Sequence, residues 1–465
     1  MKFPGVYFAY AILMAVFGQT IGGIHFGFLL CNAATIVLMF LLGKRLLGPA
    51  AGVTTAGVYG LLSLSAGVVG TSAHATHFVV FAAVGATLLL LRSIEDHRAR
   101  ILFASGFLFG VAVLMKQHGA LFAVFGTLWL VAVTVRRAEA RKERLRRLGT
   151  FAAGFLIPIL STASALWIVG VFPKFWFWTF TYAREYVSEV SLTEGLGLFT
   201  AILPRVTGPT LPLWICAALG FGLIWWKGER RTAIFLTGFL LFSFLAISPG
   251  LYFREHYFVL LLPVVALLVG ATVPFTPSLI GDVASVCVFG AILSISIYLQ
   301  SDFLFKLSPL EAARLMFTFN PFPEAVQVGE YLRNHVPRER RIAVLGSEPE
   351  IYFYADRRSA TGYIYTYGMM EPQPYALTMQ NDLIHDIETT RPEYVVQVNS
   401  PASWLIRPTS SSHIFEWWRA ERSRFYRRIG IANVISGNET QYRWGDVPPL
   451  PDESGVIIEV FEIKR

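Results

Sequence analysis

The sequence predicts a polytopic α-helical membrane protein, with about ten transmembrane helices, an N-terminal interfacial helix and a C-terminal extracytoplasmic α/β domain. The 465 residues are 54% hydrophobic and their mean hydropathy is +0.53, which is far too apolar for a soluble globular protein. Apolar runs separated by short, basic loops recur up to about residue 300. Beyond that point the apolar runs become short, and charged residues and tyrosines increase.

The N-terminal stretch, residues 3–48, predicts two helices. A Pro-Gly pair opens an apolar segment of about 14 residues, which is too short to cross a bilayer comfortably and fits a helix lying at the membrane interface. After a Gly-Gly turn, residues 25–42 are long enough to span and stop at Lys44 and Arg45. The positive-inside rule makes that basic end cytoplasmic, so the first span runs from outside to inside.

The following spans alternate in direction. Four of the five inner loops carry Lys or Arg clusters, whereas 274–282 carries none, so the last hairpin rests on alternation alone. The net charge of +8 therefore reflects membrane topology and does not indicate nucleic-acid binding. The ten expected spans are residues 25–42, 51–70, 78–91, 101–115, 120–135, 148–170, 209–226, 232–247, 256–272 and 283–299, and residues 173–208 form a long, aromatic outer segment.

The cysteines and the C-terminal region complete the predicted organisation. Cys31, Cys216 and Cys287 lie in apolar runs and provide neither a disulfide framework nor a cysteine-based metal site. Residues 1–300 are expected to form the membrane domain and 301–465 a small α/β domain, which the parity of the spans places outside. Within it we expect helices at 324–335 and 383–390 and strands at 341–345, 351–354, 394–398 and 456–463.

Polar residues at the outer ends of the spans are the candidate site. A polar group at membrane depth costs several kcal/mol unless it is paired or hydrated, so such residues are the first to consider. Arg offers a planar fork for a phosphate and Lys a point charge. The candidates for binding substrate or phosphate are Lys116, His118, Arg184, Arg254, His256 and Tyr257, and those for lining a shared cavity are His74, His77, Tyr182, Glu185 and Glu255.

Simpler interpretations stand beside these. His74 and His77 are three residues apart and compatible with a divalent metal, but no third ligand accompanies them, so neither a metal site nor a cofactor is assigned. Lys116 and Arg254 also fit the role of interface anchors. The aromatic run at 175–178 is more typical of an interfacial belt than of a substrate platform.

Three stretches resemble a known family. They are FPGVYFAYAILMAVFG followed by a span ending in LLGKRLLG, GFLFGVAVLMKQHGALF at 106–122, and FREHYFVLLLPVVALL at 253–268. In order and sidedness they resemble the dolichyl-phosphate-mannose mannosyltransferase-like (PMT-like, glycosyltransferase family 39) branch of the GT-C superfamily. The resemblance covers most of residues 3–300, and a C-terminal outer α/β domain also occurs in that family.

The resemblance implies a function: transfer of a sugar from a polyprenyl-phosphate donor to a lipid, glycan or protein acceptor at the outer face of a bacterial inner membrane. It implies inverting chemistry, in which a carboxylate of the first outer loop takes the acceptor proton and basic residues stabilise the leaving phosphate. Lys116 and Arg254 match the positions expected for phosphate binding.

One feature departs from the family pattern. The resemblance implies a further span and an acidic motif ahead of the Pro-Gly helix, yet residues 1–94 contain no Asp or Glu. The catalytic carboxylate is therefore expected upstream of Met1, in a longer chain. The alternatives are a degenerate, non-catalytic GT-C-like protein and a polytopic transporter or lipid-carrier flippase.

Overall fold

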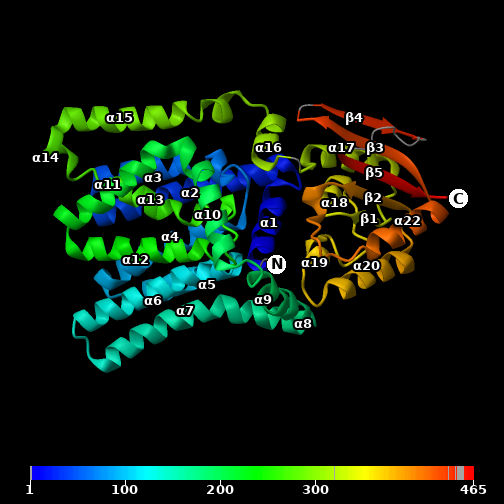
Figure 1. Cartoon of the computed structure of the whole chain (residues 1–465). Helices are drawn as coiled ribbons and strands as arrows, with labels where there is room; N and C mark the ends of the chain where they lie inside the picture. The colour runs from blue at the N-terminus through cyan, green and yellow to red at the C-terminus, as the bar shows by residue number, and fades with distance from the viewer. Residues whose placement is uncertain (1–2, 319, 438, 446, 448–454, 465) are drawn as a thin grey trace. The chain divides into compact units, whose positions relative to one another are not determined.

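The computed structural model describes residues 3–318, 320–437, 439–445, 447 and 455–464. The chain divides into two compact units, Met1–Phe305 and Lys306–Arg465 (Figure 1). The first is helical and the second contains a five-stranded sheet. The predicted fold class, a polytopic helical protein with a C-terminal α/β domain, is confirmed.

Each of the ten predicted spans overlaps an α-helix, and the predicted N-terminal helix is present. Within the described residues, six helical segments are long and apolar enough to cross a membrane by length and composition. The helices that match the N-terminal helix and the ten predicted spans are, in order, α1 (Pro4–Phe17), α2 (Ile21–Leu47), α3 (Pro49–Ser63), α4 (Ala75–Asp96), α5 (Ala99–Met115), α6 (Gly119–Arg136), α7 (Arg141–Ile168), α11 (Leu211–Lys227), α12 (Arg230–Ile247), α13 (Leu262–Gly270) and α15 (Asp282–Tyr298).

Two spans are shorter helices than the sequence predicts. The run 51–70 is α-helical only to Ser63, because a 3₁₀ turn, η1 (Ala66–Val68), follows and Val69 is left-handed with φ 54°. The run 256–272 is divided between a 3₁₀ helix, η4 (Glu255–Leu260), and α13.

The segment between α7 and α11 is made of short helices. They are α8 (Phe172–Trp176), a π-helical turn η2 (Phe177–Thr181), α9 (Tyr182–Val187), α10 (Leu192–Thr207) and a 3₁₀ turn η3 (Gly208–Thr210). In α10 the Ser191 hydroxyl caps the helix by accepting from the amide of Glu194.

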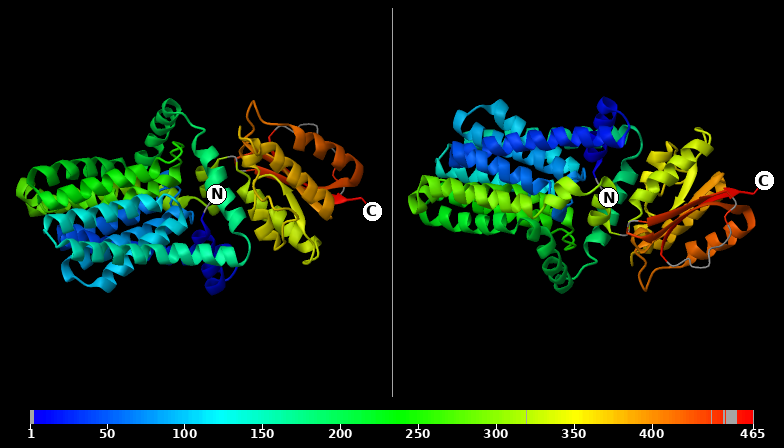
Figure 2. Two further views of the ribbon diagram at one scale, coloured as in Figure 1. Left: turned by 90° about the horizontal axis from the view of Figure 1, so that it is seen from below. Right: turned by 90° about the horizontal axis from the view of Figure 1, so that it is seen from above.

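Glycines allow α5 and α7 to lie against each other. Figure 2 shows the long helices of this unit packed side by side. A Cβ at Gly106 would stand 2.1 Å from the carbonyl oxygen of Phe151, and one at Gly154 would stand 2.1 Å from that of Phe103. Hydrophobic burial does not drive helices together in lipid, so such close backbone contact supplies the packing energy.

Helix α13 is the centre of the membrane unit. All nine of its residues are buried, and it contacts α2, α3, α11 and α12. A helix that is apolar on every side is expected at the centre of a bundle. Because η4 leads directly into α13, the residues of η4 are fixed to the most buried element of the unit.

The second unit is built on a mixed sheet with strand order β1-β2-β5-β3-β4. Strands β1 and β2 are parallel and the other neighbours are antiparallel. Helices α17 and α18 share one core with β1, β2 and β5, and α22 packs on β3. The strands are β1 (Ile342–Leu345), β2 (Tyr394–Asn399), β3 (Tyr426–Ser436), β4 (Glu439–Trp444) and β5 (Val456–Ile463).

The helices of this unit correct one prediction. Residues 351–354 are not a strand but lie in the helix α18 (Glu350–Ala355), whose Tyr352 hydroxyl accepts from the amide of Val344 in β1. The predicted helices and the other three strands are present, whereas β3 and β4 were not predicted. The other helices are α16 (Pro309–Phe317), α17 (Phe322–His335), α19 (Tyr367–Met370), α20 (Ala376–Thr390), α21 (Pro401–Trp404) and α22 (His413–Phe425).

The α5–α7 contact gives a first test. We expect Gly154→Leu to destabilise the membrane unit by about 1–3 kcal/mol or more, because the new side chain meets backbone rather than a flexible side chain. Gly149→Leu is the matched control, since nothing lies within 4 Å of a Cβ on Gly149 of the same helix. Thermal unfolding in detergent measures both, and an equal loss in the two variants would contradict the role of the contact.

A buried carboxyl in the second unit gives a pH test. Glu348 accepts from the Ser403 hydroxyl at 2.7 Å, and burial raises its pKa from 4.5 to about 7; burial likewise raises the pKa of Glu350 to about 8. Between about pH 4.5 and 8 the unfolded state loses these protons while the native state keeps them. The free energy of unfolding should therefore fall as pH rises through this window.

Hydrogen exchange of residues 342–355 in the full chain at pH 5 and pH 8 measures this dependence. Glu348→Gln should reduce it to the part that Glu350 contributes, because the amide does not titrate. Glu339→Gln, on an exposed carboxylate, should leave it unchanged.

Candidate functional site

Polar and aromatic side chains gather around η4. This 3₁₀ helix contacts α4, α12 and η1, so it stands where several helices end. The loop before it is sharply bent: Leu251 and Phe253 have φ of 55° and 43°, a region that costs a non-glycine residue of order 1–3 kcal/mol. Backbone held in this way fixes the direction of the side chains that follow.

Lys116, His118 and Tyr257 form the inner part of the site. All three are more than nine-tenths buried. The Lys116 ammonium lies 3.7 Å from the centre of the Tyr257 ring, and the His118 ring meets the same tyrosine edge-on at 4.9 Å. His118 Nδ1 lies 2.6 Å from the carbonyl oxygen of Ala246 at the end of α12, which sets the ring's orientation.

Two further histidines extend this group. The rings of His74 and His256 are stacked, with centroids 4.3 Å apart and planes 11° from parallel. His256 also meets the Tyr257 ring edge-on at 4.8 Å. We call the five connected residues the outer cluster: His74 ahead of α4, Lys116 and His118 between α5 and α6, and His256 and Tyr257 in η4.

Arg254 and Glu255 stand beside the outer cluster with partners of their own. The Arg254 guanidinium lies 5.4 Å from the centre of the Tyr252 ring, and the Tyr252 hydroxyl donates to Glu189 at 2.6 Å. Glu255 forms an ion pair with Arg205 of α10 at 3.0 Å. These contacts tie the short helices between α7 and α11 to the loop of the site.

The remaining candidates do not join the outer cluster. The buried His77 ring packs edge-on against Phe28 of α2 at 4.8 Å, and Tyr182 of α9 packs against Trp178 at 5.3 Å. In the described part of the chain, neither Arg184 nor Glu185 makes a side-chain hydrogen bond or ion pair with the cluster. Arg184 is exposed on α9.

Sequence reasoning missed Tyr252, Glu189 and Arg205. Tyr252 and Glu189 are 63 residues apart, and Arg205 lies on a helix that the sequence placed within an aromatic outer segment. Nothing in their spacing marks them as partners, because only the folded loop brings them together. As for a metal, the described residues contain no group of three or more His, Cys, Asp or Glu side chains able to hold one.

Residues 2–162 match the model of the dolichyl-phosphate-mannose-protein mannosyltransferase family. Among solved structures, ArnT from Cupriavidus metallidurans bound to undecaprenyl phosphate is similar, with 15% identity, 98% of this chain and 87% of that chain covered, and a TM-score of 0.58. Over residues 2–162 the chain resembles that family, and the whole chain shares the fold of ArnT. Its resemblance to the PMT-like branch is therefore confirmed.

Two further solved structures are similar to the chain. ArnT in the apo state has 15% identity, 98% and 87% coverage and a TM-score of 0.55. The archaeal oligosaccharyltransferase AglB from Archaeoglobus fulgidus, in complex with an inhibitory peptide and a dolichol-phosphate, has 14% identity, 96% and 67% coverage and a TM-score of 0.49. No curated protein matches the chain. Within the PMT-like match lie His74, Lys116 and His118 of the outer cluster.

The Tyr252–Glu189 hydrogen bond gives a third prediction. Tyr252→Phe should loosen residues 187–191, because a hydrogen bond to a charged group contributes about 1.5–3 kcal/mol. Faster hydrogen exchange of this segment measures the effect. Tyr298→Phe, on a tyrosine that is 77% exposed, is the control and should change nothing. Unchanged exchange in Tyr252→Phe would show that the bond does not hold the segment.

Proposed function

We propose that this PMT-like chain is an inverting membrane glycosyltransferase that transfers a sugar from a polyprenyl-phosphate donor to an acceptor. The observation that carries the proposal is the buried Lys116 ammonium, which lies against Tyr257, a ring that His118 and His256 also contact. A buried cation is costly in an apolar surrounding and is well suited to an anionic ligand. The similar ArnT structure is one bound to undecaprenyl phosphate.

The residues of the site would then divide the work. Lys116 supplies the charge that stabilises the phosphate, and Arg254, beside the cluster, offers a second cation with a planar fork. Tyr257 contacts Lys116, and the rings of His118 and His256 pack against Tyr257, where they offer hydrogen-bonding groups at fixed positions. His74 stacks on His256 and would hold that ring in place. Arg184, exposed on α9, would act only at the edge of the site.

The proposed step is a displacement at the anomeric carbon. The acceptor oxygen forms a bond to the anomeric carbon as the bond between that carbon and the phosphate oxygen breaks. The electron pair of the broken bond leaves with the polyprenyl phosphate. The acceptor proton passes to a carboxylate. Negative charge on the phosphate grows during the step, so a cation fixed beside it favours the transition state over the ground state.

Two carboxylates lie in the loops next to the outer cluster: Glu189 accepts from Tyr252, which contacts Arg254, and Glu255 precedes His256 in the chain. Each is already bound, by Tyr252 and by Arg205 respectively, and neither belongs to the acidic motif that the family resemblance implies. We therefore propose the base as a separate group from the phosphate-binding cluster. The role of Lys116 in binding the donor phosphate can then be tested by a binding measurement, without knowledge of the base.

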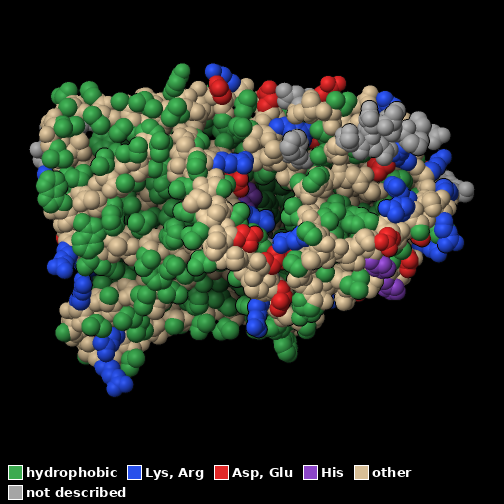
Figure 3. Space-filling model, in the orientation of Figure 1, with side chains coloured by type: hydrophobic (Ala, Val, Ile, Leu, Met, Phe, Trp, Pro, Cys, Tyr) green, Lys and Arg blue, Asp and Glu red, His purple; other side chains and the backbone are tan. Residues whose placement is uncertain are grey.

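Topology supports a site on the outer face. Lys and Arg gather at the ends of the membrane unit opposite the cluster, as at the α6–α7 turn, and Figure 3 shows blue side chains at that end of a largely hydrophobic surface. The positive-inside rule makes this end cytoplasmic. We propose a bacterial inner-membrane protein with its membrane domain in residues 1–300 and an extracytoplasmic domain in 301–465.

The position of the cluster also favours a transferase over a transporter. Transporters place their polar sites near the bilayer midplane, at broken helices of repeated halves. Here the polar residues lie at the start of α4, between α5 and α6, and ahead of α13. A degenerate, non-catalytic protein on the same scaffold would keep the helices but would not need a buried cation.

Lys116→Gln tests the proposal. We expect binding of undecaprenyl phosphate by the purified full chain, measured by thermal shift, to be lost, and release of undecaprenyl phosphate from undecaprenyl-phosphate sugars to fall roughly 10²–10³-fold. Lys174→Gln removes the same charge from exposed α8 and is the matched control. Equal binding by the wild-type chain and Lys116→Gln would contradict the assigned role.

A further inference from the structure

A groove between α6 and α12 lies away from the outer cluster, at the basic end of the membrane unit. Its volume is about 380 Å³, within the range of small-ligand sites. The buried side chains of Phe125, Trp129 and Val133 form its floor, and the more exposed Ile234 and Phe242 form one wall. The groove is therefore apolar along its length.

The groove is open because residue 238 is a glycine, which has no side chain. A Cβ on Gly238 would stand 3.0 Å from the Phe125 ring, so any larger residue there would crowd the floor. Trp129 lies on the same floor, and within the described residues its buried indole N–H has no hydrogen-bond acceptor. An unsatisfied buried donor is costly, and an oxygen-bearing ligand is one way to satisfy it.

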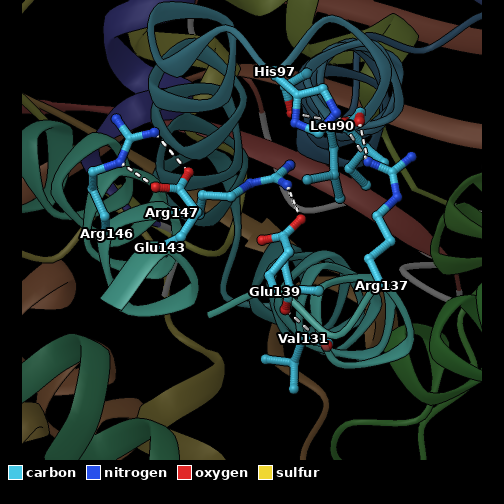
Figure 4. A network of polar contacts seen from close by, with 11 residues as sticks. Leu90, His97, Val131, Arg137, Glu139, Glu143, Arg146 and Arg147 are labelled. Atoms are coloured by element: carbon cyan, nitrogen blue, oxygen red, sulfur yellow. Dashed lines mark hydrogen bonds and ion pairs between the residues drawn. The ribbon is translucent and has the colours of Figure 1, made fainter. Parts of the chain in front are cut away.

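Three arginines stand at the mouth of the groove. Arg136 is the last residue of α6, Arg137 follows as its C-cap, and Arg231 is the second residue of α12. No acidic residue lines the groove, and in the described part of the chain Arg136 and Arg231 form no ion pair. Arg137 is anchored: it donates to the carbonyl of Ile94 at 2.7 Å (Figure 4).

The acidic residues nearest in sequence are already engaged. Glu139 forms a buried ion pair with Arg147 at 2.6 Å, and Glu143 is held by Arg146, both drawn in Figure 4. Glu229 accepts from Thr232 at 3.2 Å. The α6–α7 turn is thus fixed by its own ion pairs, and the charge at the mouth of the groove stays positive.

We propose that this groove binds an anionic phospholipid. The phosphate would lie between Arg136 and Arg231, whose planar forks match phosphate oxygens, and one acyl chain would follow the apolar floor. The basic ends of the helices place the groove at the cytoplasmic leaflet, where anionic headgroups attract juxtamembrane arginines. The site is independent of the proposed glycosyl transfer, because it lies at the opposite ends of α6 and α12 from His118 and Ala246.

Native mass spectrometry of the full chain tests the proposal, with phosphatidylglycerol and phosphatidylcholine of identical acyl chains as probes. We expect phosphatidylglycerol to be retained and phosphatidylcholine to be lost. In the double variant Arg136→Gln and Arg231→Gln, retention of phosphatidylglycerol should weaken roughly 30-fold, since each arginine near the headgroups contributes about a five-fold factor.

Matched controls separate the groove from general charge and from misfolding. Arg230→Gln with Arg141→Gln removes two charges at the same membrane face outside the groove and should leave retention unchanged. Ala132→Phe fills the groove and should abolish retention, whereas Val135→Phe, on an exposed face of the same helix outside the groove, should not. Lipid-free thermal unfolding identifies any variant that is merely unstable.

Three results would overturn the proposal: equal retention of both lipids, equal weakening in the two double variants, or retention by Ala132→Phe equal to that of Val135→Phe. The readout is lipid retention, so these results are distinct from a failure of the Lys116 assay. Dimerisation of the chain through the same face would also overturn it, by assigning the groove to a protein partner.

Discussion

A lipid bilayer offers the backbone no hydrogen-bond partner, and the rest of this structure depends on that constraint. Each crossing must therefore be a helix, and polar side chains collect where helices end and water or headgroups begin. The outer cluster follows this rule, with His74 ahead of α4, Lys116 and His118 between α5 and α6, and His256 ahead of α13. The arginines of the α6–α12 groove follow it at the opposite ends.

Packing at the centre of the bundle turns this placement into a site. Helix α13 is buried on every side, and η4 is continuous with it, so His256 and Tyr257 have little freedom to move. Lys116 ends α5 with an extended backbone, which turns the chain from the helix toward Tyr257. Close glycine contacts with α7, at Gly106 and Gly110, fix the part of α5 that precedes Lys116. The geometry of a few polar groups thus depends on apolar contacts far along the same helices.

The predicted site and the folded one overlap in part, for physical reasons. The alternating direction of the spans and the length of their apolar runs predict which span ends share one side of the membrane. Lys116, His118 and His256 could therefore be assigned to the same side from the sequence. His77 sits one helical turn from His74 yet points to α2, because a side chain's direction depends on the rotation of its helix. Tyr252 and Glu189 could not be paired in advance, since they are 63 residues apart and a loop with two left-handed residues sets the place of Tyr252.

The sequence by itself determined the membrane class, the ten helical segments and the PMT-like resemblance, because hydropathy and loop charge are properties of composition along the chain. It also predicted the β1, β2 and β5 strands, whose apolar runs are buried. The tertiary structure decided that 351–354 is helical, since Tyr352 reaches β1 only from a helix, and that the exposed β4 pairs with β3. It also decided which polar residues meet, because contacts between distant segments depend on helix rotation and packing, which hydropathy does not encode.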